Sequence, residues 1–187
     1  QDFEAGWWGN CVNTFGEETK QITYAQRMML NSVNTDGHWP VYDMKGQSVL
    51  DLGGGPVSML LKCVNLGRAT VVDPCNYPEW IDQRYQVAGV EYQRSAAEDV
   101  IPGEVYDECW IYNVLQHVQD PEKIIANARA SAKLVRIFEW IDLPPHLGHP
   151  HELRAQSLSA WLGAYGTVEQ MNENGCVGRA FYGVFGQ

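Results

Sequence analysis

The chain has 187 residues, of which 45% are hydrophobic, and its formal net charge is −10. This length suits one compact domain with a full core, and no apolar run of about 18 residues is present that would span a membrane. The 13 Lys and Arg residues are scattered, whereas a protein that binds nucleic acid needs a basic patch to neutralise phosphates. We therefore expect a single domain without a membrane span that acts on a small molecule, and we do not expect a nucleic-acid substrate.

The N-terminus and the cysteines indicate the cellular compartment. The first residues carry neither a basic region nor an apolar segment, so no signal peptide is visible. The five cysteines are odd in number, widely spaced and without a C-x-x-C pair. Reduced thiols explain this pattern better than a disulfide framework or a zinc site. We expect a cytoplasmic protein without a bound metal, and the sequence leaves its oligomeric state open.

The first part of the chain predicts a helical cap, which we place at residues 1–45. Its beginning is irregular and rich in Trp, Gly and Asn. Residues 17–33 are then expected to form a helix, because Ala25, Met29 and Val33 recur at helical spacing. The remaining residues would form the core of the domain.

The most informative stretch follows the cap. Residues 49–52 read as a buried strand that leads directly into Gly53, Gly54 and Gly55. Glycine lets a backbone turn sharply and approach a ligand. Pro56 suits the first position of a helix, which we expect over residues 57–65. The pattern predicts a strand, a tight loop and a helix N-terminus that faces a polar ligand.

The elements that follow alternate between strands and helices. Asp73 ends the second strand and lies 22 residues after Asp51, about the interval at which a nucleotide-binding unit places its ribose carboxylate. The other elements are a helix at 79–88, a strand at 90–92, a strand at 109–112, a helix at 121–132, a strand at 134–140 and a hairpin of 167–171 with 179–185. Such alternation predicts a doubly wound, mostly parallel sheet with helices on both faces. We assign residues 46–187 to this core and residues 1–187 to one domain.

Four ordered segments resemble the motifs of class I S-adenosylmethionine-dependent methyltransferases that act on small molecules. They are the acidic strand end with its glycine loop, Asp73, the segment at 95–102, and "N-V-L-Q-H-V-Q-D-P" at 113–121. The third differs from the family's "D-A-E-x-L-P", since Ala96 stands at the usual Asp position. The resemblance implies a seven-stranded sheet that ends in an antiparallel hairpin. The cofactor would be S-adenosyl-L-methionine, bound by Asp51, Gly53, Gly54, Gly55, Asp73, Ala97, Glu98, Asn113 and Val114.

Histidines supply the candidates for acid–base chemistry. His146, His149 and His151 lie in one loop after the fifth strand, at the edge where open α/β sheets bind ligands. Imidazole can take the proton that a nucleophile loses on methylation, so we expect catalytic roles for His149, His151 and His117 and substrate contact for His146. Alternatives are a surface loop and a metal site, although H-x-x-H-x-H is not a recognised zinc spacing. His117 has a further alternative as a helix cap.

The cap supplies candidates for substrate binding. Trp8, Tyr24 and Arg27 are placed to face the ligand, and packing of the cap on the sheet is the alternative for Trp8. We expect methyl transfer to a small molecule or a glycan precursor. The alternatives are a non-catalytic partner with the same fold and an NAD-dependent oxidoreductase, against which Ser58 at the third glycine position argues.

Overall fold

The computed structural model describes residues 6–33, 39–101, 103 and 105–186. Residues 1–5 and 34–38 of the expected cap therefore lie outside the described residues. The strands of the main sheet are β2 (Val49–Leu52), β4 (Ala69–Val72), β5 (Glu91–Gln93), β6 (Tyr106–Tyr112), β7 (Ala132–Ile141), β8 (Thr167–Glu173) and β9 (Cys176–Gly186). The helices are α2 (Phe15–Arg27), α3 (Glu79–Val87), α4 (Pro121–Ser131) and α5 (Ala155–Leu162), with short 3₁₀ helices η1 (Met59–Lys62) and η2 (Ala97–Asp99).

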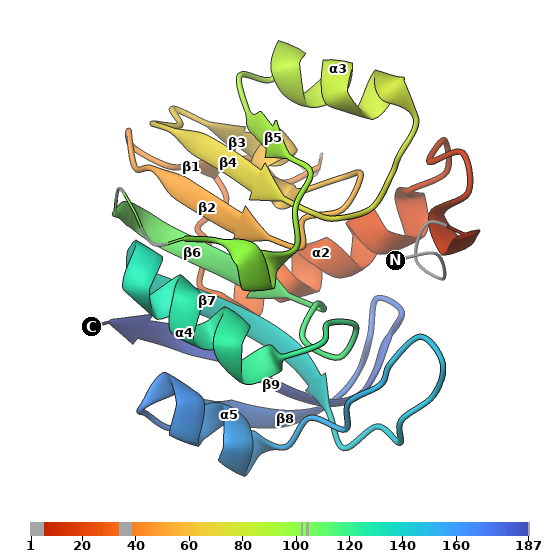
Figure 1. Cartoon of the computed structure of the whole chain (residues 1–187), viewed down its shortest axis with the longest axis vertical. Coiled ribbons are helices and arrows are strands. Elements are labelled where there is room, and N and C mark those ends of the chain that lie inside the picture. Colours follow the sequence, from red (N-terminus) through yellow and green to blue (C-terminus); the bar gives the residue numbers. More distant parts are fainter. Residues whose placement is uncertain (1–5, 34–38, 102, 104, 187) are drawn as a thin grey trace.

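Seven strands form the sheet in the order β5-β4-β2-β6-β7-β9-β8 (Figure 1). The first five are parallel, and β9 runs antiparallel to both β7 and β8. Within the register, Asp51 lies opposite Val71 on one side and Trp110 on the other. The mostly parallel seven-stranded fold with its terminal hairpin is thus confirmed, and the carboxyl ends of β2, β4 and β6 meet at one edge.

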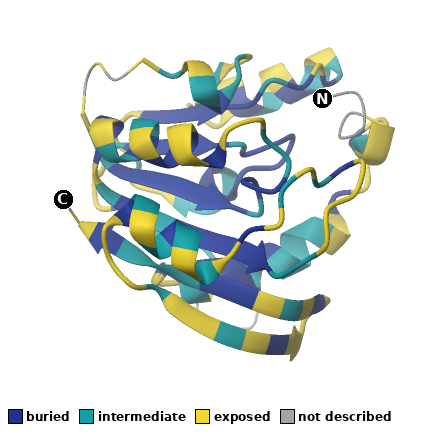
Figure 2. Cartoon of the chain, turned by 60° about the horizontal axis from the view of Figure 1, so that its bottom comes forward, coloured by how far each residue is buried: buried dark blue, intermediate teal, exposed yellow. Residues whose placement is uncertain are grey.

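Helices cover both faces of the sheet, because successive strand residues point to opposite sides. On one face, α2 and α3 bury Tyr24 and Tyr85 against strand residues such as Trp110. On the other face, α4 and α5 bury Ile124 and Leu158 against the alternate strand residues. Strand β2 is buried along its length and β6 over its last five residues, whereas the outermost strand β8 is largely exposed (Figure 2).

The prediction of a helix directly after the glycine loop, over residues 57–65, is wrong. The structure has only the four-residue η1, after which β3 (Cys63–Val64) pairs in parallel with β1 (Tyr42–Asp43). Two tyrosine hydroxyls take the backbone N–H groups that would begin a helix: Ser58 N donates to Tyr85 Oη at 2.9 Å and Met59 N donates to Tyr112 Oη at 3.1 Å. Pairing with β1 and these long-range hydrogen bonds outweigh the local preference for a helix.

Helix α2 is also shorter than expected. It ends at Arg27 instead of Val33, because Met29 adopts a left-handed conformation with φ +59°. Arg27 does not face a ligand as predicted. It pairs with Glu169 at 2.9 Å and with Glu173 at 2.6 Å on the outer hairpin strand, which ties the end of α2 to β8.

Other local expectations are confirmed. Asp120 caps α4 by accepting a hydrogen bond from Lys123 N at 2.9 Å. Asn174 (φ 48°) and Gly175 (φ 76°) form the two-residue turn between β8 and β9, as an Asn-Gly hairpin requires.

Helix α5 is an element that the sequence analysis did not predict.

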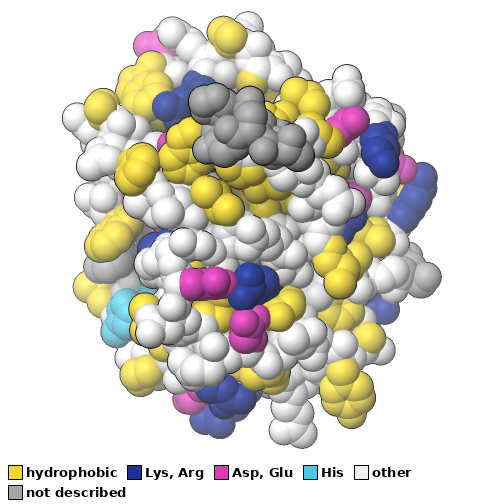
Figure 3. Space-filling view, turned by 180° about the vertical axis from the view of Figure 1, so that it is seen from behind, with side chains coloured by type: hydrophobic (Ala, Val, Ile, Leu, Met, Phe, Trp, Pro, Cys, Tyr) yellow, Lys and Arg dark blue, Asp and Glu magenta, His cyan; other side chains and the backbone are white. Residues whose placement is uncertain are grey.

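The surface carries mixed charge. On the face seen from behind, basic side chains lie singly or beside acidic ones, and no broad basic area is visible there (Figure 3). Among the described residues, no helix has the length and apolar character needed to cross a membrane.

Candidate functional site

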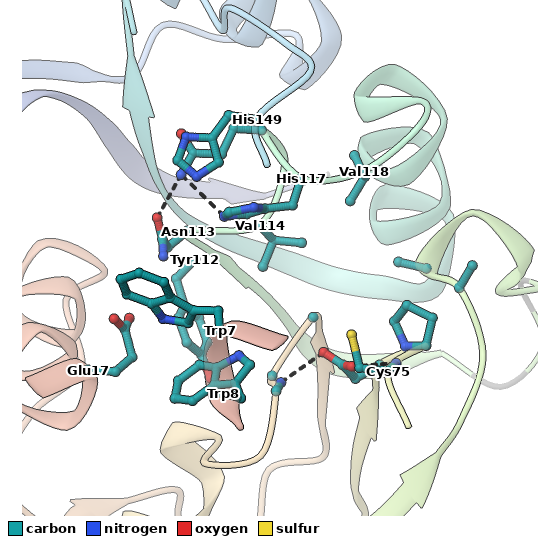
Figure 4. Close-up of a pocket in the computed structure, with 18 of the residues that line it drawn as sticks. Trp7, Trp8, Glu17, Cys75, Tyr112, Asn113, Val114, His117, Val118 and His149 are labelled. Atoms are coloured by element: carbon teal, nitrogen blue, oxygen red, sulfur yellow. Dashed lines mark hydrogen bonds between the residues drawn. The ribbon is translucent and has the colours of Figure 1, made fainter. Parts of the chain in front are cut away.

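A cavity of about 660 Å³ opens at the carboxyl ends of β2, β4 and β6. Its volume lies within the range of small-molecule sites, roughly 300–1,000 Å³. Six parts of the chain converge on it: the glycine loop, the segment after β4, the segment that contains η2, the loop after β6, the end of β7 with the loop that follows, and the N-terminal segment with α2 (Figure 4). The cavity thus lies where an open α/β sheet binds its ligands.

The three glycines line this cavity for different steric reasons. A Cβ on Gly53 (φ 78°) would lie 2.6 Å from the side chain of Val114. A Cβ on Gly54 would lie 2.6 Å from Asp51 Oδ2 and 3.0 Å from Val71 Cγ1. Only Gly55 faces open space, although its φ of 62° still favours glycine. The loop therefore lies against the sheet edge and presents backbone to the cavity.

Asp51 supports the glycine loop from below and does not line the cavity. It is fully buried and accepts hydrogen bonds from Tyr112 Oη at 2.7 Å and from the Ser58 hydroxyl. Burial raises the pKa of this carboxyl to about 7, and the two hydroxyl donors limit the rise. Its predicted role in direct cofactor binding becomes one of holding the loop in place.

Asp73 lies in the cavity wall and is 6% exposed. Its carboxylate accepts hydrogen bonds from Gly55 N at 3.1 Å and Cys75 N at 2.9 Å. Burial raises its pKa, and these backbone N–H groups oppose the rise. The Cys75 and Tyr77 side chains also hydrogen-bond this carboxylate. Each carboxylate oxygen offers about two acceptor positions, so a ligand's hydroxyls would share Asp73 with the protein's own donors.

The residues Ala97 and Glu98 both line the cavity from η2. Asn127 of α4 holds their backbone by donating to Ala97 O at 3.2 Å and Glu98 O at 3.0 Å. The Glu98 carboxylate accepts a hydrogen bond from Gln119 N at 2.9 Å. Both residues thus lie at the cavity, where contact of their backbone with a ligand stays a prediction.

The loop after β6 rests on a carboxylate that sequence reasoning missed. Asn113 and Val114 line the cavity, and Asn113 is left-handed with φ 56°. Beneath them, Glu139 of β7 accepts hydrogen bonds from Val114 N at 2.9 Å and Leu115 N at 3.1 Å. Glu139 is fully buried, which raises its pKa to about 7, while the two N–H donors oppose the rise. The one available signal was an acidic residue inside the apolar run Ile137-Phe138-Glu139-Trp140-Ile141.

Three imidazole rings, those of His117, His146 and His149, line the cavity, and Figure 4 labels His117 and His149. The ring centroid of His149 lies 4.3 Å from that of His117 and 4.1 Å from that of His146. His117, from the loop after β6, thus meets His149 of the loop after β7. His151 does not join them, since it lies outside the cavity lining and its Nε2 is bonded to Val118 O at 2.8 Å.

The backbone determines which nitrogen of His117 carries a proton. His117 Nδ1 lies 2.9 Å from Gly148 O, and a carbonyl oxygen can only accept a hydrogen bond. Nδ1 is therefore the donor, and Nε2 is the nitrogen that can accept a proton when the ring is neutral.

The N-terminal segment contributes more residues to the cavity lining than predicted, and some of them are not the predicted ones. Trp8 lines the cavity as expected, together with Trp7, Glu17 and Lys20, which the sequence did not single out. Tyr24 is a correction: it is fully buried, its ring centroid lies 4.4 Å from that of Phe138, and it is not part of the lining. It faces the sheet because the stripe of α2 that carries it packs into the core.

The cavity shows no metal-binding cluster: no group of three or more His, Cys, Asp or Glu among the described residues has the arrangement of a metal site.

One family model and several solved structures resemble this chain. Residues 50–133 match the family model described as a methyltransferase domain. No curated protein matches the chain. The N-methyltransferase NodS from Bradyrhizobium japonicum, solved with S-adenosylhomocysteine, superposes with a TM-score of 0.63 at 12% identity, over 95% of this chain and 92% of that one.

Two further solved structures share the fold. The 1,6-didemethyltoxoflavin-N1-methyltransferase from Burkholderia thailandensis gives a TM-score of 0.62 at 15% identity, over 100% of this chain and 82% of that one. Mitomycin 7-O-methyltransferase gives 0.57 at 19% identity over 90% of this chain. This chain spans only 54% of that enzyme's length.

Proposed function

We propose that this chain is a class I methyltransferase that transfers a methyl group from S-adenosyl-L-methionine to a small-molecule or glycan-type acceptor. The observation that carries the proposal is the meeting of the glycine loop, Asp73 and the Ala97–Glu98 backbone around one cavity beside Asn113 and three histidines. The five cysteines are all thiols, which suits a location in the cytoplasm.

The residues in the cavity fit this cofactor. Position 54 requires glycine, because a Cβ there would collide with Asp51 and Val71. Without side chains, the loop can bring its backbone close to the methionine part of the cofactor. The buried Asp73 carboxylate suits the ribose hydroxyls, and the backbone at Ala97 suits the adenine. When bound, the cofactor supplies an activated methyl group on a sulfonium, so the protein's main contribution is to position the acceptor.

The first prediction concerns the cofactor site. In calorimetric titrations, we expect micromolar binding of S-adenosylmethionine and S-adenosylhomocysteine and no binding of NAD. The variant Asp73→Ala should bind both sulfur ligands at least ten-fold more weakly, because a hydrogen bond to a charged group contributes about 1.5–3 kcal/mol.

The control for this titration is Asp82→Ala. Asp82 lies on α3, where it pairs with exposed Arg94 at 3.2 Å, and it is outside the cavity lining. Its replacement should leave both affinities unchanged. Binding of NAD, or absence of sulfur-ligand binding by folded protein, would contradict the proposed cofactor.

Proton removal from the acceptor is assigned to the histidines of the cavity. His117 is fixed by Gly148 with Nε2 as its basic nitrogen, and His149 lies against its ring. We therefore propose His117 as the general base, with His149 and His146 beside the acceptor. His151 and Tyr24 take no part, since neither lines the cavity.

The second prediction tests this assignment. His117→Asn keeps a donor toward Gly148 O but removes the base, so we expect kcat to fall by about 10²-fold or more with little change in S-adenosylhomocysteine affinity. His151→Ala also removes an imidazole bonded to a backbone carbonyl, and it should retain kcat. Equal rates for both variants would reject the assignment. Tight cofactor binding without transfer to any acceptor tested would favour a non-catalytic partner of this fold.

A further inference from the structure

Aromatic side chains line two sides of the part of the cavity that the proposed cofactor-binding residues do not line. Trp7 and Trp8 line it from the N-terminal segment, and Trp140 and Leu143 lie at the end of β7 and just beyond it. In the close-up, the two indoles lie next to each other, below Asn113 and across from the histidine rings (Figure 4). Trp7 is 74% exposed in this structure. Because Trp7 lines the cavity and is this exposed, its indole is open to contact with a ligand.

The opposite wall consists of His146 and His149. Their ring centroids lie 4.1 Å apart, and an edge-to-face contact of 4.3 Å with 84° between planes fixes His149 against His117. Flat groups on both sides of a cavity favour a flat ligand. Each offset or edge-to-face contact between rings stabilises binding by about 0.5–1.5 kcal/mol beyond what burial of apolar area contributes.

The charges around the cavity limit the acceptor further. Glu17, Asp73, Glu98 and Asp99 all line it, and the lysine that lines it, Lys20, is paired with Glu17 at 3.3 Å. An anionic acceptor would therefore meet net negative charge without a cation to bind it. A neutral ring avoids this repulsion.

Resting on the proposed function, we propose that the acceptor is a planar, neutral aromatic or heteroaromatic ring that carries an ionisable O–H or N–H. The ring lies between Trp7 and Trp8 on one side and His146 and His149 on the other, and its O–H or N–H points toward His117. The hydroxyl or amine proton passes to His117 Nε2, and the freed lone pair forms a bond to the methyl carbon. The bond from that carbon to sulfur breaks, and its electron pair stays on sulfur, which balances the step.

The test measures binding rather than turnover. The protein is first saturated with S-adenosylhomocysteine and then titrated calorimetrically with 6-hydroxyquinoline, a planar ring with an ionisable O–H, and separately with glucose. We expect the hydroxyquinoline to bind and glucose not to bind. Trp7→Ala and Trp8→Ala should each weaken hydroxyquinoline binding about ten-fold, which corresponds to about 1.4 kcal/mol, and Trp8→Phe should restore part of the loss.

Trp80→Ala is the matched control, because Trp80 is a half-buried indole on α3 that stacks with Arg84 and lies outside the cavity lining. It should bind hydroxyquinoline as the unmodified protein does. Glucose binding without hydroxyquinoline binding, or equal affinities in the Trp7, Trp8 and Trp80 variants, would overturn the inference while S-adenosylhomocysteine binding upheld the proposed function. Loss of S-adenosylhomocysteine binding in the Trp7 or Trp8 variant would assign that indole to the cofactor and overturn its place in the acceptor wall. If the unmodified protein did not bind S-adenosylhomocysteine, the proposed function would fail, and this inference with it.

Discussion

Replacing Gly54 with alanine is expected to destabilise the fold by about 3 kcal/mol, at the upper end of what overpacking a core costs, and to weaken S-adenosylhomocysteine binding at least ten-fold. The added Cβ would lie 2.6 Å from Asp51 Oδ2 and 3.0 Å from Val71 Cγ1. Asp51 cannot easily give way, because it is fully buried on the central strand β2 and held by Tyr112. The strand end or the loop must therefore shift. Urea unfolding and calorimetric titration of the same preparation measure the two effects.

Gly55→Ala is the control that separates steric conflict from backbone strain. Its Cβ would meet only Trp8 and Tyr77, each at 3.8 Å, so only the positive φ of 62° opposes it. A left-handed conformation costs a non-glycine residue roughly 1–2 kcal/mol. If Gly54→Ala were as stable as Gly55→Ala or more so, the tight packing of Gly54 on Asp51 would not be what the loop depends on.

Replacing Glu139 with leucine is expected to lower the free energy of unfolding by about 3–5 kcal/mol. The change leaves the N–H groups of Val114 and Leu115 buried without their acceptor, and each unsatisfied group costs about 1–3 kcal/mol. The loop that carries Asn113 and His117 would lose its support, so cofactor affinity should fall as well. Glu139→Gln retains an acceptor oxygen and should avoid this loss of stability and affinity.

The same residue predicts a dependence on pH. Burial raises the pKa of Glu139 to about 7, whereas an unfolded chain has a value of about 4.3. The folded state therefore holds its proton to higher pH than the unfolded state does, so this residue lowers the free energy of unfolding as pH rises from about 4 to 7. Glu139→Gln removes this effect and should gain stability relative to the unmodified protein between pH 5 and pH 8. Parallel stability curves for the two proteins over that interval would show that Glu139 does not titrate as proposed.

Much of the fold follows from local patterns. The strand that ends in Asp51 and three glycines, the acid at Asp73 and the Asp120-Pro121 helix start each depend on neighbours in sequence. Strands that alternate with helices have few arrangements open to them, so these signals were enough for the sheet and for the edge where the cavity lies. They also placed Gly53–Gly55, Asp73, Ala97 and Asn113 around that cavity.

The sequence by itself therefore determined the alternation of strands and helices, the terminal hairpin and the loops at the glycine end of the cavity, because strand periodicity and turn chemistry act over a few residues. Only the tertiary structure decided that Ser58 and Met59 pair with distant tyrosines instead of starting a helix. It likewise decided that Glu139 supports the loop of His117 from the neighbouring strand. It also brought Trp7 into the cavity wall and left His151 outside it. These outcomes depend on contacts between segments far apart in the chain, and the free energy of such contacts outweighs the propensities that a local pattern expresses.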